Sequence, residues 1–201
     1  HHEVPLPEGC VADIYDGERV TEIQTGNFSG FRRKLVKLLE AYPVTVVYPF
    51  PRTRYLIWTD PATGETSRPR KSPKIGTPLT ALHELYHIRT LLGVEALTVE
   101  LLLFDLDEYR LLDGYGKSKK KGSTLGEKIP RGEPELIRLQ TVEDYEALLP
   151  ADLPTEFTAP QFGKLTGLRG RSVYSAIHVL EELGILLPTE KQGRAMVYKL
   201  R

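Results

Sequence analysis

Two short runs of alternating apolar and polar residues, joined by an Asp-Gly pair, constrain the fold of this 201-residue chain more than any other feature. The runs cover residues 10–15 and 19–25, and the Asp-Gly pair occupies residues 16–17. An Asp-Gly pair between two such runs is a strong signal for a β-hairpin. The sequence therefore predicts two antiparallel strands near the start of the chain.

Oxygen-bearing side chains gather on one face of this predicted hairpin. Residues two apart in a strand share a face, so Glu22 and Gln24 project together. Hairpin pairing can bring Asp13 beside them on that face. Two carboxylates with an amide next to them form a hard oxygen-ligand site that suits Mg²⁺.

The order of these residues resembles the PD-(D/E)xK nuclease superfamily, which has the restriction-endonuclease-like fold. Its metal-binding Asp precedes a Glu-x-Lys on the next strand, and here Asp13 precedes Glu22-Ile23-Gln24. Gln24 stands where Lys is usual, and the resemblance implies that Lys34 on the following helix supplies the missing positive charge. It also implies that Asp13, Glu22 and the main-chain carbonyl of Ile23 hold Mg²⁺ or Mn²⁺. In that scheme Gln24 positions the nucleophile.

The elements after the hairpin continue an α/β pattern. Apolar residues at helical spacing predict a helix over about 30–41, with Ser29 as its N-cap. Residues 44–48 predict a buried strand that ends at the prolines of 49–51, and residues 55–58 predict another strand. With a short edge strand before the hairpin, this order predicts a mixed α/β (α+β) sheet. The resembled fold normally begins with a further helix carrying an acidic residue; this chain begins His-His-Glu, so we expect a fragment, a processed chain or residual tag histidines.

Two basic segments are candidates for phosphate contacts. Residues 68–74 hold four cations and two prolines, which predicts a stiffened loop whose Arg70, Lys71 and Lys74 grip a DNA backbone. A solvated surface loop is the alternative. Residues 116–140 begin with a Gly/Ser/Lys run, which predicts a flexible linker or a loop along a phosphate backbone.

A zinc motif lies in the next predicted helix, which runs over about 78–92. His83, Glu84 and His87 match H-E-x-x-H, in which two His one turn apart bind zinc and the Glu acts as general base. A zinc peptidase also needs a third ligand from a later helix, and only Glu95 and Glu100 follow nearby. A five-residue motif with only three fixed positions often matches by chance. A zinc metallopeptidase is therefore only a minor alternative.

The last sixty residues resemble a winged helix-turn-helix domain. Residues 141–201 predict a short helix, two further helices separated by a glycine turn, and two strands around a basic tip. In that family the second helix of the turn enters the major groove and the wing contacts the backbone or minor groove. The resemblance implies contacts to duplex DNA from these exposed positions: Arg169, Arg171, Ser172, Ser175, Lys191 and Arg194. A winged helix used for protein contacts is the alternative.

Composition sets the remaining limits. The chain holds 27 basic and 27 acidic residues, so any contact with phosphate must come from local clusters rather than from a basic chain as a whole. It has one cysteine, which excludes an internal disulfide and suits the cytoplasm. No apolar run reaches the roughly 20 residues of a membrane span.

Taken together, the sequence predicts a restriction-endonuclease-like domain over 1–115, a basic linker over 116–140 and a winged helix over 141–201. We expect a metal-dependent DNA endonuclease. A homodimer is compatible with this function, because a double-strand cut commonly uses two active sites. The main alternative is a catalytically silent DNA-binding or regulatory protein, which Gln24 favours.

Overall fold

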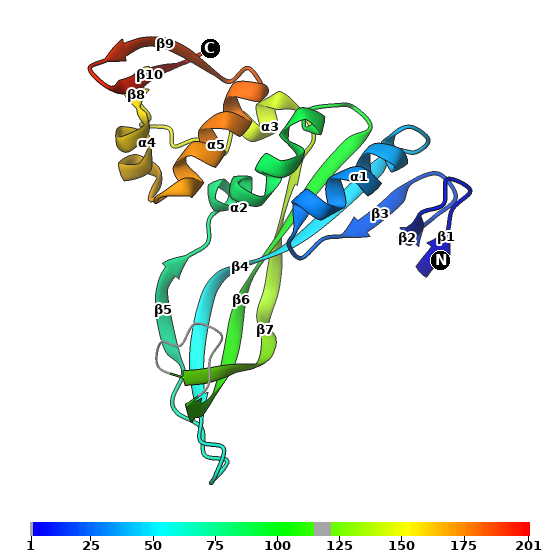
Figure 1. The fold of residues 1–201 in the computed structure, drawn as a ribbon, viewed down its shortest axis with the longest axis vertical. Coiled ribbons are helices and arrows are strands. Elements are labelled where there is room, and N and C mark those ends of the chain that lie inside the picture. Colours follow the sequence, from blue (N-terminus) through cyan, green and yellow to red (C-terminus); the bar gives the residue numbers. More distant parts are fainter. Residues whose placement is uncertain (1, 115–121) are drawn as a thin grey trace. The chain divides into compact units, whose positions relative to one another are not determined.

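The computed structural model describes residues 2–114 and 122–201, which form two compact units (Figure 1). The first unit comprises His1–Pro49, Pro78–Leu101 and Ile137–Arg201, and the second comprises Phe50–Thr77 and Leu102–Leu136. This division differs from the predicted one. The C-terminal residues that we expected to form a separate domain belong to the same compact unit as the N-terminal hairpin.

A mixed β-sheet with the strand order β1-β2-β3-β4-β6-β7 runs through the chain, and β5 pairs with β4. In the first unit β2 pairs antiparallel with both β1 and β3, and β3 runs parallel to β4. The predicted hairpin and the predicted α+β class with a mixed sheet are therefore confirmed. The strands are β1 (His2–Pro5), β2 (Val11–Tyr15), β3 (Val20–Ile23), β4 (Val44–Thr59), β5 (Arg70–Ile75), β6 (Leu97–Gly114) and β7 (Gly122–Leu139).

Helix α1 (Phe28–Leu39) buries one apolar stripe, formed by Phe28, Phe31, Leu35 and Leu38 at spacings of three and four. The helix begins earlier than predicted, because Asn27 rather than Ser29 is its N-cap. Asn27 adopts the left-handed conformation that Asn tolerates, and its side chain accepts a hydrogen bond from the Gly30 N–H. The buried stripe leaves the basic side chains of α1 at its margins.

The C-terminal part of the first unit contains helices and a separate three-stranded antiparallel sheet of order β8-β10-β9. Helix α5 packs against α4 of this part, but it also packs against α2 and the 3₁₀ helix η1, which come from the N-terminal part of the chain (Figure 1). That second contact explains why the two parts form one unit. The elements are α2 (Pro78–Leu85), η1 (Tyr86–Leu91), α3 (Val142–Glu146), β8 (Glu156–Thr158), α4 (Ala159–Thr166), α5 (Arg171–Glu182), β9 (Leu186–Gln192) and β10 (Ala195–Leu200).

In the second unit the strands continue where the sequence predicted interruptions. Strand β4 runs unbroken through Pro49 and Pro51, so the predicted strand end there was wrong. N–H groups two residues apart point to the same side of a strand, so both prolines leave donors missing on one edge only. The predicted basic loop over 68–74 was also wrong from Arg70 onward, because Arg70–Ile75 form β5 and pair antiparallel with β4.

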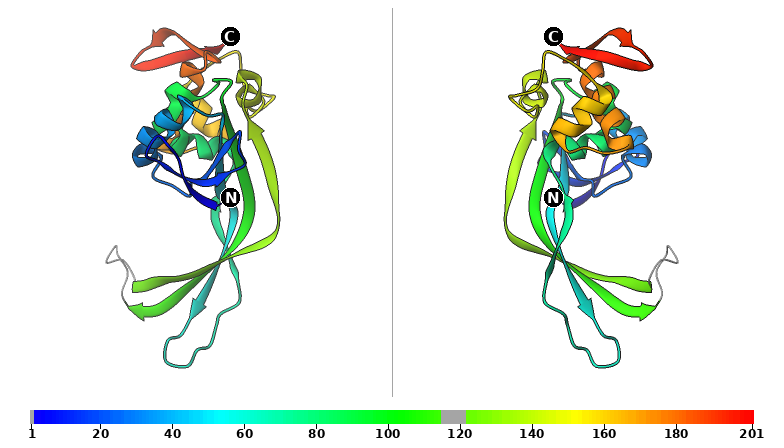
Figure 2. Two further views of the ribbon diagram at one scale, coloured as in Figure 1. Left: turned by 90° about the vertical axis from the view of Figure 1, so that its right-hand side faces the viewer. Right: turned by 90° about the vertical axis from the view of Figure 1, so that its left-hand side faces the viewer.

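The predicted linker over 116–140 was wrong for its larger part. Residues 122–139 form the long strand β7, which lies beside β6 (Figure 2). Most of its side chains are exposed and many are charged, so it lacks the buried apolar alternation that identifies a strand from sequence. The basic run at residues 117–121 lies outside the described residues.

Candidate functional site

The pairing between β2 and β3 gives way to side-chain contacts at the two predicted carboxylates. The backbone register pairs Ile14 with Thr21. Beyond that point, the Ile23 N–H donates to Asp13 Oδ2 at 2.7 Å, and the Asp13 N–H donates to Glu22 Oε1 at 3.4 Å. The two carboxylates therefore lie opposite one another across the strands, as the sequence predicted.

Lys34 reaches the same place from helix α1. Its Nζ lies 2.5 Å from Glu22 Oε2. The Glu22 side chain is 4% exposed, whereas that of Lys34 is 31% exposed. Burial raises the pKa of Glu22 above its usual value, and Lys34 opposes that rise by hydrogen bonding and by its charge. Asp13 adds a smaller repulsion that also raises the Glu22 pKa. Glu22 is thus a buried carboxylate whose ionised form depends on one nearby cation.

Gln24 follows Glu22 but makes a different contact. Its side-chain Nε2 donates a hydrogen bond to the Gly26 carbonyl in the turn that precedes α1. The Gln24 N–H continues the parallel ladder by donating to the Val47 carbonyl at 2.9 Å. The amide therefore supports the turn between β3 and α1.

The donor set at this site fits a divalent metal ion that prefers oxygen. Mg²⁺ commonly binds one or two carboxylates and completes its shell with waters and substrate phosphates. Asp13 and Glu22 provide two carboxylates close together, and the backbone of Ile23 is already tied to Asp13. Within residues 2–114 and 122–201 no group of three His, Cys, Asp or Glu side chains is arranged to hold a metal. A metal here would be held by two carboxylates and would depend on water or substrate for its other ligands.

Helix α5 is buried on more sides than the sequence suggested. Arg169 and Arg171 are exposed and Ser172 is partly exposed, as expected for a DNA-contacting surface. Ser175, in contrast, is only 9% exposed, and its Oγ forms a 2.9 Å hydrogen bond with Nδ1 of His83 on α2. The prediction that Ser175 contacts DNA was wrong, because α2 covers that side of the helix.

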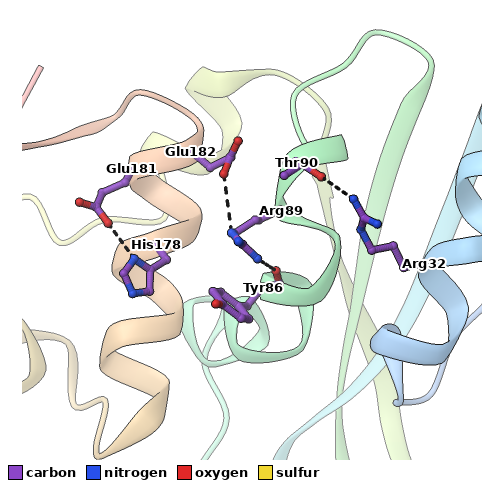
Figure 3. A network of polar contacts seen from close by, with 7 residues as sticks. All are labelled: Arg32, Tyr86, Arg89, Thr90, His178, Glu181 and Glu182. Atoms are coloured by element: carbon purple, nitrogen blue, oxygen red, sulfur yellow. Dashed lines mark hydrogen bonds and ion pairs between the residues drawn. The ribbon is translucent and has the colours of Figure 1, made fainter.

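The C-terminal half of α5 joins a polar network with η1 (Figure 3). Arg89 stacks over the Tyr86 ring at 4.3 Å and lies 3.6 Å from Glu182. On the same helix His178 forms a 2.9 Å contact with Glu181. Sequence patterns gave no signal for this network, because its members lie about 90 residues apart in the chain.

The remaining predicted DNA contacts are exposed. Lys191 belongs to β9 and Arg194 to the turn before β10, at the tip of the C-terminal hairpin. Arg70, Lys71 and Lys74 are exposed on β5 in the second unit. These five cations are accessible to a phosphate backbone.

The H-E-x-x-H segment is divided between two helices. Helix α2 ends at Leu85, and the chain continues as the tighter helix η1 from Tyr86. A 3₁₀ helix has three residues per turn, so the segment is not the continuous α-helix on which a zinc peptidase carries its two His. His83 also uses its Nδ1 with Ser175.

Comparison with known families matches residues 1–140 to the family described as Domain of unknown function (DUF8091). This match covers more than two thirds of the chain, so the chain belongs to that family. Comparisons with curated proteins and with solved structures gave no match. The structure also contains no helix, among its described residues, that is long and apolar enough to cross a membrane.

Proposed function

We propose that this protein is a metal-dependent DNA endonuclease with its catalytic centre at Asp13, Glu22 and Lys34. One observation carries the proposal: three charged side chains from β2, β3 and α1 meet where strand pairing stops, and one of them is almost completely buried. A buried carboxylate costs free energy unless it is paired, so a fold keeps such a group at the expense of stability. Strained electrostatics of this kind are typical of functional sites.

The chain's own residues have separate roles in this proposal. Asp13, Glu22 and the Ile23 carbonyl would hold Mg²⁺ or Mn²⁺, which when bound supplies an acidified water and positive charge beside the scissile phosphate. Lys34 places a further positive charge at the Glu22 carboxylate and takes the place of the usual Lys at position 24. Gln24 would orient the attacking water once its side-chain amide gives up its hydrogen bond to the Gly26 carbonyl.

The C-terminal elements support DNA as the partner. The order α3, β8, α4, α5, β9, β10 resembles a winged helix-turn-helix domain, in which α5 would enter the major groove and the β9–β10 hairpin would be the wing. Arg171 and Ser172 would contact DNA from the first turn of α5 and Arg169 from the segment just before it, whereas Lys191 and Arg194 would contact it from the wing. The exposed N-terminal end of α5 is the part of a recognition helix that contacts base edges in this family.

A catalytically silent DNA-binding protein is the second candidate. The specific observation that favours it is Gln24, which cannot supply the charge of Lys and already donates its amide hydrogen to Gly26. On this alternative the carboxylates persist as a structural pair with Lys34, and DNA binding is the whole function.

Cleavage of supercoiled and linear DNA in Mg²⁺ or Mn²⁺ tests the proposal. We expect cutting by the unaltered protein and its loss in Asp13→Asn and in Glu22→Gln, which keep the size of each side chain. Glu18→Gln, an exposed substitution in the same hairpin, is the matched control and should cut normally. DNA binding measured in a chelator should be equal in all four proteins.

The same experiment separates the two candidates. Binding without cutting in either metal, with no effect of the two carboxylate substitutions, supports the silent DNA-binding protein. Cutting that survives both substitutions would place the catalytic centre elsewhere and overturn the proposed site.

A further inference from the structure

A groove on the second unit combines an aromatic ring with unpaired cations. It lies where β5 pairs with β4, and Leu56, Trp58, Arg70, Lys71 and Ile75 are among its lining residues. The register pairs Leu56 with Arg70, so these two side chains share one face of the sheet, and Trp58 follows Leu56 on that face. Arg70 therefore shares a sheet face with the indole ring, and Lys71, which pairs with Tyr55, lines the groove from the next position of β5.

The cations of this strand have no acidic partner in the described parts of the chain. Arg70, Lys71 and Lys74 are all exposed, and no ion pair involves them among residues 2–114 and 122–201. The nearby Arg52, in contrast, is paired with Asp105 and Glu135. The β5 cations have no acidic partner among the described residues, whereas Arg52 has two, and this difference indicates that an anionic partner binds the β5 edge.

The Trp58 indole ring also lies close to a cation within the second unit. The Arg110 guanidinium lies 5.9 Å from the centre of the Trp58 ring, and Glu108 holds Arg110 by a 2.5 Å ion pair. The Glu108 side chain is nearly buried, so it anchors Arg110 in place. A second such pair, Arg131 over Tyr55 at 4.5 Å, lies in the same unit. Aromatic side chains stack with nucleobases, and neighbouring cations contribute cation–π contacts and attract the phosphates.

From this arrangement we propose that the groove at Trp58 binds single-stranded nucleic acid. A base stacks on or beside Trp58, and the neighbouring phosphates contact Arg70 and Lys71. Stacking platforms beside a basic track are how proteins hold single strands without sequence preference. A duplex hides the faces of its bases, so the aromatic part of this groove favours an unpaired strand. This binding site does not depend on the catalytic proposal, because no residue of the Asp13 site takes part.

Trp58 is the only tryptophan of the chain, so intrinsic fluorescence reports directly on the proposed site. We would titrate the full chain with a deoxythymidine strand of about a dozen nucleotides, a length within the usual range for such sites. A chelator would be present so that cleavage cannot contribute. We expect saturable quenching of the Trp58 emission that weakens as salt rises.

Variants then assign the binding to this groove. Arg70→Ala/Lys71→Ala should raise the dissociation constant about 10-fold or more, because two phosphate contacts are lost. Arg33→Ala/Lys37→Ala removes the same charge from exposed positions of helix α1 in the first unit and should leave the quenching unchanged. With a fluorescently labelled strand, Trp58→Ala should weaken binding about 5- to 150-fold, the range found when one stacked base loses its aromatic partner.

Several results would overturn the proposal. The strand could leave the Trp58 emission unchanged, or quench it equally in the Arg70→Ala/Lys71→Ala variant. Quenching by a duplex of the same length but not by the single strand would assign the groove to duplex DNA instead. Circular dichroism would first establish that each variant is folded.

Discussion

Replacing Lys34 by Met tests the electrostatic account of the candidate site. Met keeps most of the length and apolar volume of the Lys stem but removes its charge. The Glu22 carboxylate, whose side chain is 4% exposed, then loses the cation that lies 2.5 Å away. Its remaining close contacts are the Asp13 N–H, which donates a hydrogen bond, and the Asp13 carboxylate, which repels it.

The magnitude follows from the burial of the two partners. Removing one partner of a fully buried ion pair costs about 3–5 kcal/mol. Lys34 is nearly one third exposed, so water already screens part of this pair and reduces the effect. We expect Lys34→Met to lower the free energy of unfolding by about 2 kcal/mol at neutral pH. For a chain of about 200 residues this corresponds to a fall in Tm of roughly 4–8 °C.

The loss of stability should depend on pH in a defined direction. Burial raises the folded-state pKa of Glu22 above the unfolded value, and removing Lys34 raises it further. A raised carboxyl pKa leaves stability unaffected below the unfolded pKa and lowers it increasingly as the pH rises through the folded pKa. The difference between Lys34→Met and the unaltered protein should therefore be small near pH 4, about the ordinary glutamate pKa, and larger at about pH 7.

Urea unfolding at both pH values, with Glu22→Gln and the double variant, measures this directly. In the double variant no buried charge remains at position 22, so we expect Lys34→Met to cost little on the Glu22→Gln background. Mg²⁺ should stabilise Lys34→Met more than the unaltered protein, because it would restore a positive charge beside Glu22. A loss of stability that is the same at both pH values and on both backgrounds would show that Lys34 acts through packing alone and would refute the reasoning.

Two further substitutions test the packing. Gly76→Ala should destabilise the second unit by about 1–3 kcal/mol, measured by urea unfolding, because its new Cβ would collide with the Pro51 carbonyl oxygen and the Phe50 ring. Gly26→Ala is the control, because a Cβ at Gly26 would meet only open space. Ser175→Ala should lower the free energy of unfolding by about 1 kcal/mol through the loss of the His83 hydrogen bond. The same variant should bind DNA as tightly as the unaltered protein, whereas Ser172→Ala should bind more weakly with unchanged stability.

The hairpin and its carboxylates could be predicted from sequence because local rules determine them. The Asp-Gly turn fixes the pairing of β2 with β3, and pairing places Asp13 opposite Glu22. Lys34 could be predicted as the cation of the site from its place beside the apolar stripe of α1. Each of these inferences spans fewer than 25 residues, a range over which turn geometry and helical periodicity are reliable guides.

The failed predictions depend on contacts between distant segments. Strand β7 lacks the apolar alternation of a strand, and it is ordered by pairing with β6 rather than by its own composition. Ser175 was expected to be exposed, because in an isolated winged helix-turn-helix domain that side of the recognition helix would be free. The helix that covers it, α2, comes from a segment about 90 residues earlier, and no local pattern in α5 records that neighbour.

Helix α1 links the candidate catalytic centre to the C-terminal helices through its own packing. Lys34 extends from α1 to Glu22, and two residues earlier Arg32 donates a hydrogen bond to Thr90 on η1 at 3.3 Å. The same η1 packs on α5, where Arg89 lies 3.6 Å from Glu182. The position of the Lys34 charge is therefore set by a helix that is held from both sides, by the sheet and by η1. In this family member the helix expected to contact DNA and the helix that completes the carboxylate site thus share one intermediate element, which a separate DNA-binding domain on a flexible linker would not provide.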